Sequence, residues 1–439
     1  MDNRENIVFF FSDQQRYDTL GCNGQPLNIT PNLDQIAEEG VNFSRCYTPQ
    51  PVCGPARSVL QSGLYPTQTG CFTNRISLPL NIKTLANHMT EAGYNVAYVG
   101  KWHLASNRNK NYYRTSAVPP ERRGGYNDYW MVADMLEFTS HGYGGYVFDK
   151  DGNKVEFKDY RCDCITDFAL DYIKNYNDRK PFFIMISHIE PHHQNDRNRY
   201  EGPEGSRERF ANFVKPDDLE EGKGDWQEQF PDYLGCCHSL DYNFGRVVQA
   251  LKDKGIYDQT MLIYASDHGN HFRTLLSEKS PNGGTDDYKR TSFENTIHVP
   301  LIIKGKSFSG GKVEDKLVSL IDLPKTIMTA AGCRIEERVQ GDALQNIFTD
   351  PHWKEEVYVQ TERYKYVIHA PDLNPWESMT TDIWQEKYLF DLGKDPLEKH
   401  NLLDDPDYAS IKEDMKSRLV RCAKKAGENI VSILPAKRQ

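Results

Sequence analysis

Short, continuously apolar runs alternate with amphipathic stretches through most of the chain. Residues 7–11 are apolar at every position, as expected of a strand that helices cover on both faces. Similar strand-like runs lie at residues 96–99, 182–186, 261–264 and 299–303. Helical patterns lie between them, at residues 31–40, 84–92, 165–176 and 242–254. The alternation predicts an α/β fold in which a large, mostly parallel sheet is sandwiched by helices.

The pattern changes after about residue 350. Short alternating runs rich in aromatic residues lie at 357–360, 364–368 and 388–391, and a helical pattern begins near Tyr408. These runs predict a small antiparallel sheet with one helix. A hairpin that turns at residues 151–153 is predicted as an insertion into the main sheet unit. We therefore expect a main α/β domain at residues 1–350 and a smaller C-terminal α+β subdomain at residues 351–439.

Composition and charge exclude several classes of protein. The chain has 38% hydrophobic and 26% charged residues, which is typical of a globular protein. A net charge of -10 without a basic stripe argues against nucleic-acid binding. No run of eighteen apolar residues predicts a membrane-spanning helix, and the first residues lack a signal-peptide pattern. A secreted protein whose signal peptide had been removed would look the same at this end.

Cysteine spacing bears on the compartment of the protein. The ten cysteines are scattered, with spacings that suit neither a disulfide scaffold nor a zinc ribbon. We therefore expect reduced thiols in a cytoplasmic protein.

Polar side chains follow four of the predicted strands, which is where ligands bind in open α/β sheets. Asp13, Gln14, Asp267 and His268 offer oxygen and nitrogen atoms of the kind that bind a divalent cation. None of the four is a thiolate that would select zinc, so calcium, magnesium or manganese fits better. The clusters themselves are residues 12–14, 100–103, 187–193 and 266–269.

The run Cys53-Gly54-Pro55-Ala56-Arg57 resembles the Cys-x-Pro-x-Arg signature of type I sulfatases, which are formylglycine-dependent members of the alkaline phosphatase superfamily. Ser62-Gly63 and Pro66 follow it, as in that family's pattern. The resemblance implies an alkaline-phosphatase-like fold and the hydrolysis of a sulfate monoester of an aryl, steroid or carbohydrate alcohol. It extends over nearly the whole chain, through motifs at residues 13–16, 100–103, 191–192, 267–269, 289–294, 389–391 and 395–396.

The resemblance also implies a nucleophile that the chain does not encode directly. A sulfatase-maturating enzyme would oxidise Cys53 to formylglycine, whose hydrate carries two hydroxyl groups. One hydroxyl attacks sulfur and expels the alcohol, and deprotonation of the other then releases sulfate. A divalent metal held by Asp13, Gln14, Asp267, His268 and residue 53 would polarise the ester. The family favours Ca²⁺, with Mn²⁺ or Mg²⁺ as alternatives.

Further roles follow from the same resemblance. Arg57 lies one helical turn from Cys53 and would stabilise the hydrate. Lys101 and Lys289 would bind the sulfate oxygens. His103 is the candidate base and His192 the candidate acid for the leaving oxygen. His193 and His188 are alternatives for the acid.

Two departures from the family pattern leave other functions open. Many arylsulfatases have Asp-Asp and Asp-Asn where this chain has Asp13-Gln14 and Asp267-His268. The variant pairs resemble choline sulfatases and phosphonate monoester hydrolases of the same superfamily. A phosphonate monoester hydrolase or phosphodiesterase is therefore one alternative, and a non-catalytic anion- or glycan-binding relative with an unconverted Cys53 is another. The sequence predicts neither the natural alcohol nor the oligomeric state.

Overall fold

The computed structural model describes residues 4–108, 112–275, 288–357, 360–371, 373–374 and 376–436. Its main sheet contains ten strands, and the five at its centre, β9-β1-β8-β4-β5, are all parallel. Antiparallel strands flank this parallel centre, as in a mixed sheet. In spatial order the strands are β12 (Lys312–Glu314), β2 (Val41–Phe43), β11 (Leu301–Lys304), β9 (Thr260–Ser266), β1 (Asn6–Ser12), β8 (Phe182–Ser187), β4 (Asn95–Lys101), β5 (Tyr129–Ala133), β6 (Tyr143–Phe148) and β7 (Lys154–Tyr160).

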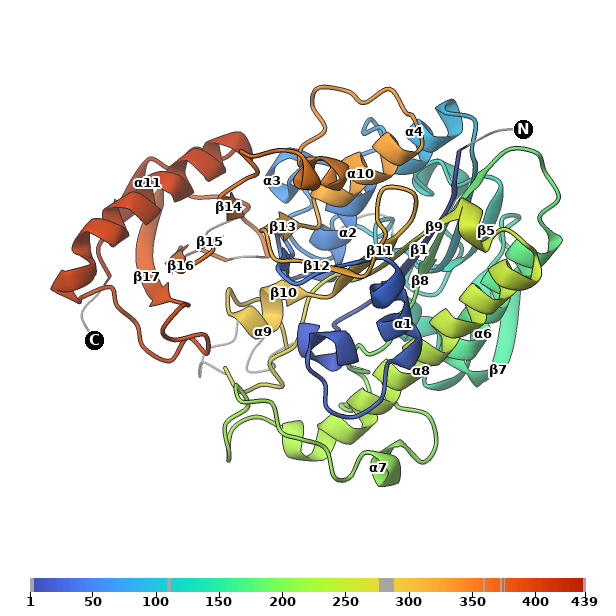
Figure 1. Ribbon diagram of the computed structural model, residues 1–439, viewed down its shortest axis with the longest axis horizontal. Helices are drawn as coiled ribbons and strands as arrows, with labels where there is room; N and C mark the ends of the chain where they lie inside the picture. Colours follow the sequence, from blue (N-terminus) through green and yellow to red (C-terminus); the bar gives the residue numbers. More distant parts are fainter. Residues whose placement is uncertain are drawn as a thin grey trace.

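Helices cover both faces of this sheet (Figure 1). Successive residues of β1 point to opposite faces, so Phe9 and Phe11 belong to one buried cluster and Val8 and Phe10 to the other. The first face packs against α2 (Cys53–Ser62), α4 (Leu85–Glu91) and α10 (Asp322–Ala330). The second packs against α1 (Pro31–Glu39), α6 (Arg161–Asn175) and α8 (Trp226–Asp253). The predicted sandwich is confirmed.

Shorter elements complete the main unit. The predicted hairpin is present as β6 and β7, which pair antiparallel. None of the described helices is both long and apolar enough to cross a membrane. Short helices are α3 (Pro66–Thr69), α5 (Leu136–Thr139), α7 (Ser206–Arg209) and α9 (Glu294–Ile297). Turns of 3₁₀ helix lie at Tyr17–Thr19, Gly21–Asn23, Pro120–Arg122, Tyr257–Gln259, Leu344–Phe348 and Pro406–Tyr408.

Two predicted elements differ from the structure. The strand expected at residues 299–303 is divided at Pro300, which has no N–H for a strand ladder. Its first part, β10 (His298–Val299), joins a second sheet with β3 (Cys46–Tyr47) and β13 (Val318–Ser319), and its second part is β11. The helix expected at residues 242–254 begins at Trp226 instead. Polar residues such as Gln229 and Asp232 are buried in its first half and hide the apolar pattern.

The C-terminal part is a small sheet covered by one helix (Figure 1). Strands β14 to β17 pair antiparallel, as predicted, and β18 adds to β17 in parallel. Met415 and Leu419 of the helix pack on Tyr366 and Leu389 of the sheet. Residues 358 and 359 of the strand predicted at 357–360 lie outside the described residues. The elements are β14 (Glu356–Val357), β15 (Gln360–Thr361), β16 (Tyr364–His369), β17 (Ile383–Asp391), α11 (Ala409–Lys425) and β18 (Ser432–Leu434).

Candidate active site

Parallel strand ends bring the polar motifs to one edge of the main sheet. Strands β1 and β9 pair in register up to their last residues, so Asp13 and Asp267 directly follow neighbouring strand ends. The backbone N–H of Gln14 donates to Oδ1 of Asp267 over 2.9 Å. Both carboxylates are fully buried. The sheet thus fixes two acidic groups beside each other at the edge where ligands bind in open α/β sheets.

Cys53 is the first residue of α2. Val52 before it is extended, and the N–H of Gly54 donates to Oδ1 of Asn74 over 2.9 Å. The helix ends at Gly63, whose φ of 65° is the left-handed conformation that glycine adopts at low cost. Every residue of α2 is buried, and Cys53 itself is 1% exposed. The N-terminus of the helix therefore lies inside the protein.

The thiol of Cys53 lies among the predicted site residues. Its Sγ is 3.5 Å from Oδ1 of Asp13 and 3.4 Å from Nε2 of His268. The Nζ of Lys289 donates to the same sulfur over 3.0 Å. Together with Asp267, these groups offer four candidate ligand atoms within 4.8 Å of one another, from Asp13, Cys53, Asp267 and His268. Segments far apart in the sequence thus meet at one point.

Burial and charge shift the pKa values at this point in opposite directions. Burial by itself raises the pKa of the Cys53 thiol, but the positive charges of Lys289 and Lys101 lower it well below its ordinary range. Burial and the negative charge of Asp13 raise the pKa of Asp267 to about 7. The site therefore stabilises an anion at residue 53. Without a further positive charge, it destabilises the state in which Asp13 and Asp267 are both ionised.

The donor set fits a divalent cation. Oδ2 of Asp267 is buried and accepts no hydrogen bond from the described residues, and such an oxygen normally has a partner. Gln14 is fully buried as well, and its side-chain oxygen accepts from the N–H of His193 over 3.2 Å. Two carboxylates, an amide oxygen and the imidazole of His268 are ligands for hard or borderline ions. The residues present can hold such an ion.

Arg57 and Lys101 are buried cations that face Asp13. Nη2 of Arg57 and Nζ of Lys101 each lie 2.9 Å from Oδ2 of Asp13. Burial and the charge of Cys53 raise the pKa of Asp13. The positive charges of Lys101, His192 and Arg57 lower it by more than that, so the pKa lies below its ordinary value and this carboxylate is ionised. Arg57 is 1% exposed, which excludes a solvated surface role. Its hydrogen bonds go to Asp13, Ser187 and the carbonyl of Lys101.

Of the three histidines considered for the acid, His192 lies closest to this cluster. Its Nε2 is 3.0 Å from Nζ of Lys289 and 4.0 Å from Oδ1 of Asp13. His193 packs against Tyr200 and Tyr288 and its Nδ1 is bonded to Asn195. His188 lies in the core beside Cys162 and Phe10, where burial lowers its pKa to about 3. The rings of His193 and His188 therefore contact groups outside the cluster.

His103 follows β4 on a loop that an acidic residue holds in place. Its ring is near enough to Cys53 to help lower the pKa of the thiol. Its backbone N–H donates to the carbonyl of Asp134 over 2.7 Å, and its φ is 60°. The carboxylate of Asp134 accepts three further N–H groups, from residues 104, 105 and 106. Asp134 thus positions the loop that carries His103.

Three supporting residues are assigned no role by sequence reasoning. Glu137 lies 3.4 Å from Nζ of Lys101, Ser187 donates to the Lys101 carbonyl, and Asp134 holds the adjacent loop. Ser187 ends β8, so its place in a polar cluster after a strand was a usable signal. The two acids lie in a stretch without a readable motif, and only the tertiary structure brings them to the site.

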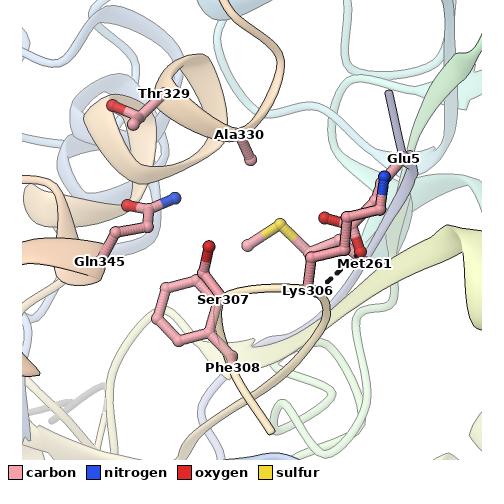
Figure 2. A pocket seen from close by; sticks show the side chains of 8 residues that line it. All are labelled: Glu5, Met261, Lys306, Ser307, Phe308, Thr329, Ala330 and Gln345. Atoms are coloured by element: carbon pink, nitrogen blue, oxygen red, sulfur yellow. Dashed lines mark hydrogen bonds between the residues drawn. The ribbon is translucent and has the colours of Figure 1, made fainter. Parts of the chain in front are cut away.

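A separate pocket of about 190 Å³ lies at the opposite end of the strands (Figure 2). Glu5, just before β1, and Met261, near the start of β9, both line it. Asp13 and Asp267 follow the other ends of the same two strands. This pocket is therefore no part of the candidate active site.

Similarity to solved structures defines the class of the fold. The structure of BT4656 in complex with its substrate D-glucosamine-2-N,6-O-disulfate matches with a TM-score of 0.79 at 22% identity, over 97% of this chain and 98% of that one. Phosphonate monoester hydrolase of Agrobacterium radiobacter matches with a TM-score of 0.69 at 19% identity, over 96% of both chains. This chain therefore shares its fold with these two hydrolases.

Sequence comparison then gives the family. A family model described as sulfatase matches residues 5–333, so the chain belongs to the sulfatase family, whose members are sulfuric ester hydrolases. A second model, N-sulphoglucosamine sulphohydrolase C-terminal, matches residues 285–425. The uncharacterized sulfatase YidJ of Escherichia coli K12 is 29% identical over 95% of this chain and 86% of its own. The N-acetylglucosamine-6-O-sulfatase of Bacteroides thetaiotaomicron is 23% identical over 97% and 87%.

Proposed function

We propose that this sulfatase hydrolyses the sulfate monoester of a carbohydrate. The observation that carries the reaction is the position of Cys53 Sγ, within 3.5 Å of Asp13, His268 and Lys289 at once. The sugar is supported by the relatives, because one is named an N-acetylglucosamine-6-O-sulfatase and the C-terminal part matches a model named for a sulphoglucosamine enzyme. A sulfated amino sugar is therefore the substrate class that we favour over aryl and steroid sulfates.

The chain's own cations suit the sulfate group. Lys101 and Lys289 are buried, and Lys101 contacts Asp13 whereas Lys289 contacts Cys53. In a site without bulk water each ammonium interacts strongly with a sulfate oxygen, and more strongly as charge develops during bond cleavage. Arg57 keeps Asp13 ionised and oriented, and its fixed donor geometry holds the two residues together.

The proton that the leaving oxygen needs can come through Lys289 and His192. Nζ of Lys289 and Nε2 of His192 are 3.0 Å apart, which is a hydrogen-bond distance. Cleavage of the S–O ester bond leaves an alkoxide, which takes a proton from this pair as the alcohol departs. His103, on the Cys53 side, is placed to accept the proton that residue 53 loses when sulfate is released.

Two groups supplied after synthesis complete the proposal. Formylglycine at residue 53, formed from Cys53 by a sulfatase-maturating enzyme, would supply the hydrated nucleophile. A divalent metal, with Ca²⁺ expected before Mn²⁺ or Mg²⁺, would be held by Asp13, Gln14, Asp267, His268 and residue 53, and would supply Lewis-acid polarisation of the ester. Metal analysis of protein purified without chelators identifies the ion.

Co-expression with a maturating enzyme tests the proposed reaction. Intact-peptide mass analysis reports conversion of Cys53, because replacement of the thiol by a carbonyl lowers the mass. The converted protein is expected to release inorganic sulfate from 6-sulfated N-acetylglucosamine faster than from 4-nitrophenyl sulfate. Equal or higher kcat/KM on the aryl ester would contradict the carbohydrate assignment. Unconverted Cys53 in protein from the native host would support a non-catalytic, glycan-binding relative instead.

A phosphonate monoester hydrolase or phosphodiesterase is the second candidate function. Gln14 and His268 replace a carboxylate and an amide of many arylsulfatases, and a phosphonate monoester hydrolase shares the fold. The ratio of kcat/KM for a sulfate monoester to that for an aryl phosphodiester or phosphonate monoester separates the two. A ratio well above one supports the sulfatase, and a ratio well below one supports the alternative.

We further propose that the protein works in a reducing compartment such as the cytoplasm. The ten cysteines of the chain are all free thiols, which is the usual state where glutathione is abundant. Cell fractionation of the native host tests the location, and recovery of the protein from the periplasm or medium would contradict it.

A further inference from the structure

Two arginines from distant segments contact Trp376 of the C-terminal part. The guanidinium of Arg290 lies 4.1 Å from the centre of the Trp376 ring, and that of Arg108 lies 4.9 Å from it. Nη1 of Arg108 also donates to the carbonyl of Trp376 over 2.8 Å. The backbone N–H of Arg108 donates to the carbonyl of a third arginine, Arg75, over 3.0 Å. We call Arg75, Arg108, Arg290 and Trp376 the arginine cluster.

The cluster is joined to the candidate active site along two short paths. Arg290 directly follows Lys289, whose ammonium contacts the thiol of Cys53. Arg75 directly follows Asn74, whose side chain accepts the N–H of the residue after Cys53. Both ends of the cluster are thus one residue away from groups that contact the start of α2. The segments that carry Arg290 and Arg75 are therefore the same segments that contribute Lys289 and Asn74 to the candidate active site.

Two arginines of the cluster lack a close counter-ion among the described residues. Within the part of the chain that the structure describes, no carboxylate lies within 4.0 Å of the guanidinium of Arg75 or Arg108. Burial and the like charge of Arg75 and Arg290 lower the pKa of Arg108, against the opposing charge of Glu377. Arg75 and Arg108 are exposed to solvent. Cations held together at an exposed position favour a bound anion.

The aromatic ring gives this group a defined geometry. Stacking uses the face of a guanidinium and leaves its in-plane N–H groups as donors, which is the arrangement that recognises a carboxylate or sulfate. Because Trp376 contacts both Arg108 and Arg290, it fixes the spacing between two of the cations. A merely solvated arginine would have no such fixed partner.

We propose that the arginine cluster is a second anion subsite, which binds a carboxylate or a further sulfate group on the same saccharide. The natural substrate would then carry at least two negative charges, one on the ester that is cleaved and one bound at the cluster. This inference rests on the proposed function for the nature of the reaction. It adds a preference for polyanionic glycan fragments over neutral sugars that carry a single sulfate.

Kinetics with matched substrates test the subsite. The probes are N-acetylglucosamine 6-sulfate, glucosamine 2-N,6-O-disulfate, and a 6-sulfated disaccharide that carries a uronic acid. The wild-type enzyme is expected to have a lower KM for at least one of the doubly charged probes, and the two probes separate sulfate from carboxylate recognition. Arg108→Gln is expected to reduce this preference about tenfold. Equal KM values for all three probes in the wild type would overturn the proposal.

Controls separate charge from fold. Arg421→Gln removes the same charge from an exposed position on α11, and it is expected to keep the wild-type preference. Arg108→Lys is expected to restore only part of the preference, because an ammonium lacks the planar fork. Trp376→Ala should raise the KM for the doubly charged probes more than for the singly charged one. A preference that Arg108→Gln and Arg421→Gln reduce equally would reflect net charge and would contradict the subsite.

Binding measurements keep this test independent of turnover. Calorimetric titration of the Cys53→Ala protein with the same three saccharides reports affinity without any cleavage. Tighter binding of a doubly charged saccharide, lost in Cys53→Ala/Arg108→Gln, supports the subsite even if no sulfate ester is hydrolysed. If sulfate is released but neither KM nor affinity depends on the second charge, the subsite is wrong and the proposed function stands.

Discussion

Asp13 and Asp267 illustrate how single side chains define the candidate metal site. Arg57 and Lys101 contact Asp13, whereas Oδ2 of Asp267 accepts no hydrogen bond from the described residues. The raised pKa of Asp267, about 7, arises from burial and from the charge of Asp13. A divalent cation would lower this pKa through its positive charge. It would also give Oδ2 of Asp267 a partner, because that oxygen would bind the cation.

Asp267→Asn should separate metal binding from folding. The substitution removes one of the two repelling charges, so the metal-free variant is expected to unfold at the same temperature as the wild type or at a higher one. Added calcium should stabilise the wild type by about 2.7 kcal/mol at a hundredfold excess over Kd, and the variant by much less. Sulfate release by the variant should fall by at least about a hundredfold.

Thermal unfolding with and without calcium checks this expectation. Asp241→Asn provides a control, because Asp241 is buried away from the site and accepts the N–H of Leu33 in α1. That variant should keep the full calcium effect. A calcium effect of equal size in Asp267→Asn and in the wild type would show that residue 267 does not bind the ion.

Most residues of the candidate active site could be predicted from the sequence, because parallel strands end at a common edge of the sheet. Asp13 and Asp267 directly follow strands and Lys101 ends one, so their meeting point is a property of the sheet. The choice of His192 over His193 and His188 depends instead on where each ring points, which the sequence does not encode locally. Glu137 was not predicted because its contact with Lys101 depends on where the tertiary structure places the short helix α5.

The contact between β4 and β8 depends on a glycine. Gly100 pairs with Ser187, has a φ of 99°, and would place a Cβ 2.0 Å from the carbonyl oxygen of Ser187. Ser187 in turn accepts a hydrogen bond from Arg57, and Lys101 follows the glycine directly. The absence of a side chain at residue 100 thus lets two strands deliver site residues to the same edge.

Gly100→Ala is expected to lower the free energy of unfolding by about 3 kcal/mol or more, through backbone strain and the clash with β8. Activity should fall with it, because Arg57 and Lys101 lose their positions. Gly70→Ala is the matched control, since Gly70 has a φ of 78° and no atom within 4 Å of the added Cβ. It should cost only about 1 kcal/mol. Similar urea midpoints for the two variants would contradict this role of Gly100.

Elements whose apolar pattern is continuous were predicted well, and those with buried polar residues were not. Strand β1 and its neighbours have clear runs because both of their faces are covered. The part of α8 before residue 242 contains buried polar residues, such as Asp241, that accept tertiary hydrogen bonds. Pro300 shows the converse, because a continuous apolar run was divided by one residue that cannot donate a backbone hydrogen bond.

The C-terminal part is tied to the main domain by a buried ion cluster. Lys365 of β16 lies 2.6 Å from Oε1 of Glu294 and 2.6 Å from Oε1 of Glu398, and its Nζ also donates to the carbonyl of Ser292. Glu294 and Ser292 belong to the segment that begins with Lys289. The smaller sheet therefore holds the segment that carries Lys289 of the candidate active site. The domain boundary at residue 350 remains a prediction.

This cluster predicts a pH effect on stability. Burial and the charge of Glu294 raise the pKa of Glu398 to about 7, against the opposing effect of Lys365. Its ordinary value is 4.5, so the stability that protonated Glu398 contributes is complete below about 4.5 and is lost as the pH rises through about 7. Glu398→Gln mimics the protonated form. It should match the wild type near pH 5 and exceed it by on the order of 2 kcal/mol near pH 8.

Urea unfolding at the two pH values measures this difference. Tyr47 and His298, which contact Glu294, are the other titratable groups at the junction, and they are unchanged in the variant. A stability difference that is the same at both pH values would show that Glu398 does not change its protonation over this range.

The fold as a whole was predictable because alternating strands and helices, once recognised, allow few topologies. The reaction chemistry was predictable only because the motif at residues 53–57 occurs in a sequence with the pattern of that fold. What the sequence could not give is the approach of Arg75, Arg108 and Trp376, which lie on three separate segments.

Sulfate release by fully converted protein tests the central claim most directly. Peptide mass analysis first establishes that residue 53 carries formylglycine, and inorganic sulfate is then measured with a sulfated glucosamine and calcium. We predict multiple turnovers by the converted wild type and none by Cys53→Ala. Complete conversion without sulfate release from any sulfate monoester would contradict the account.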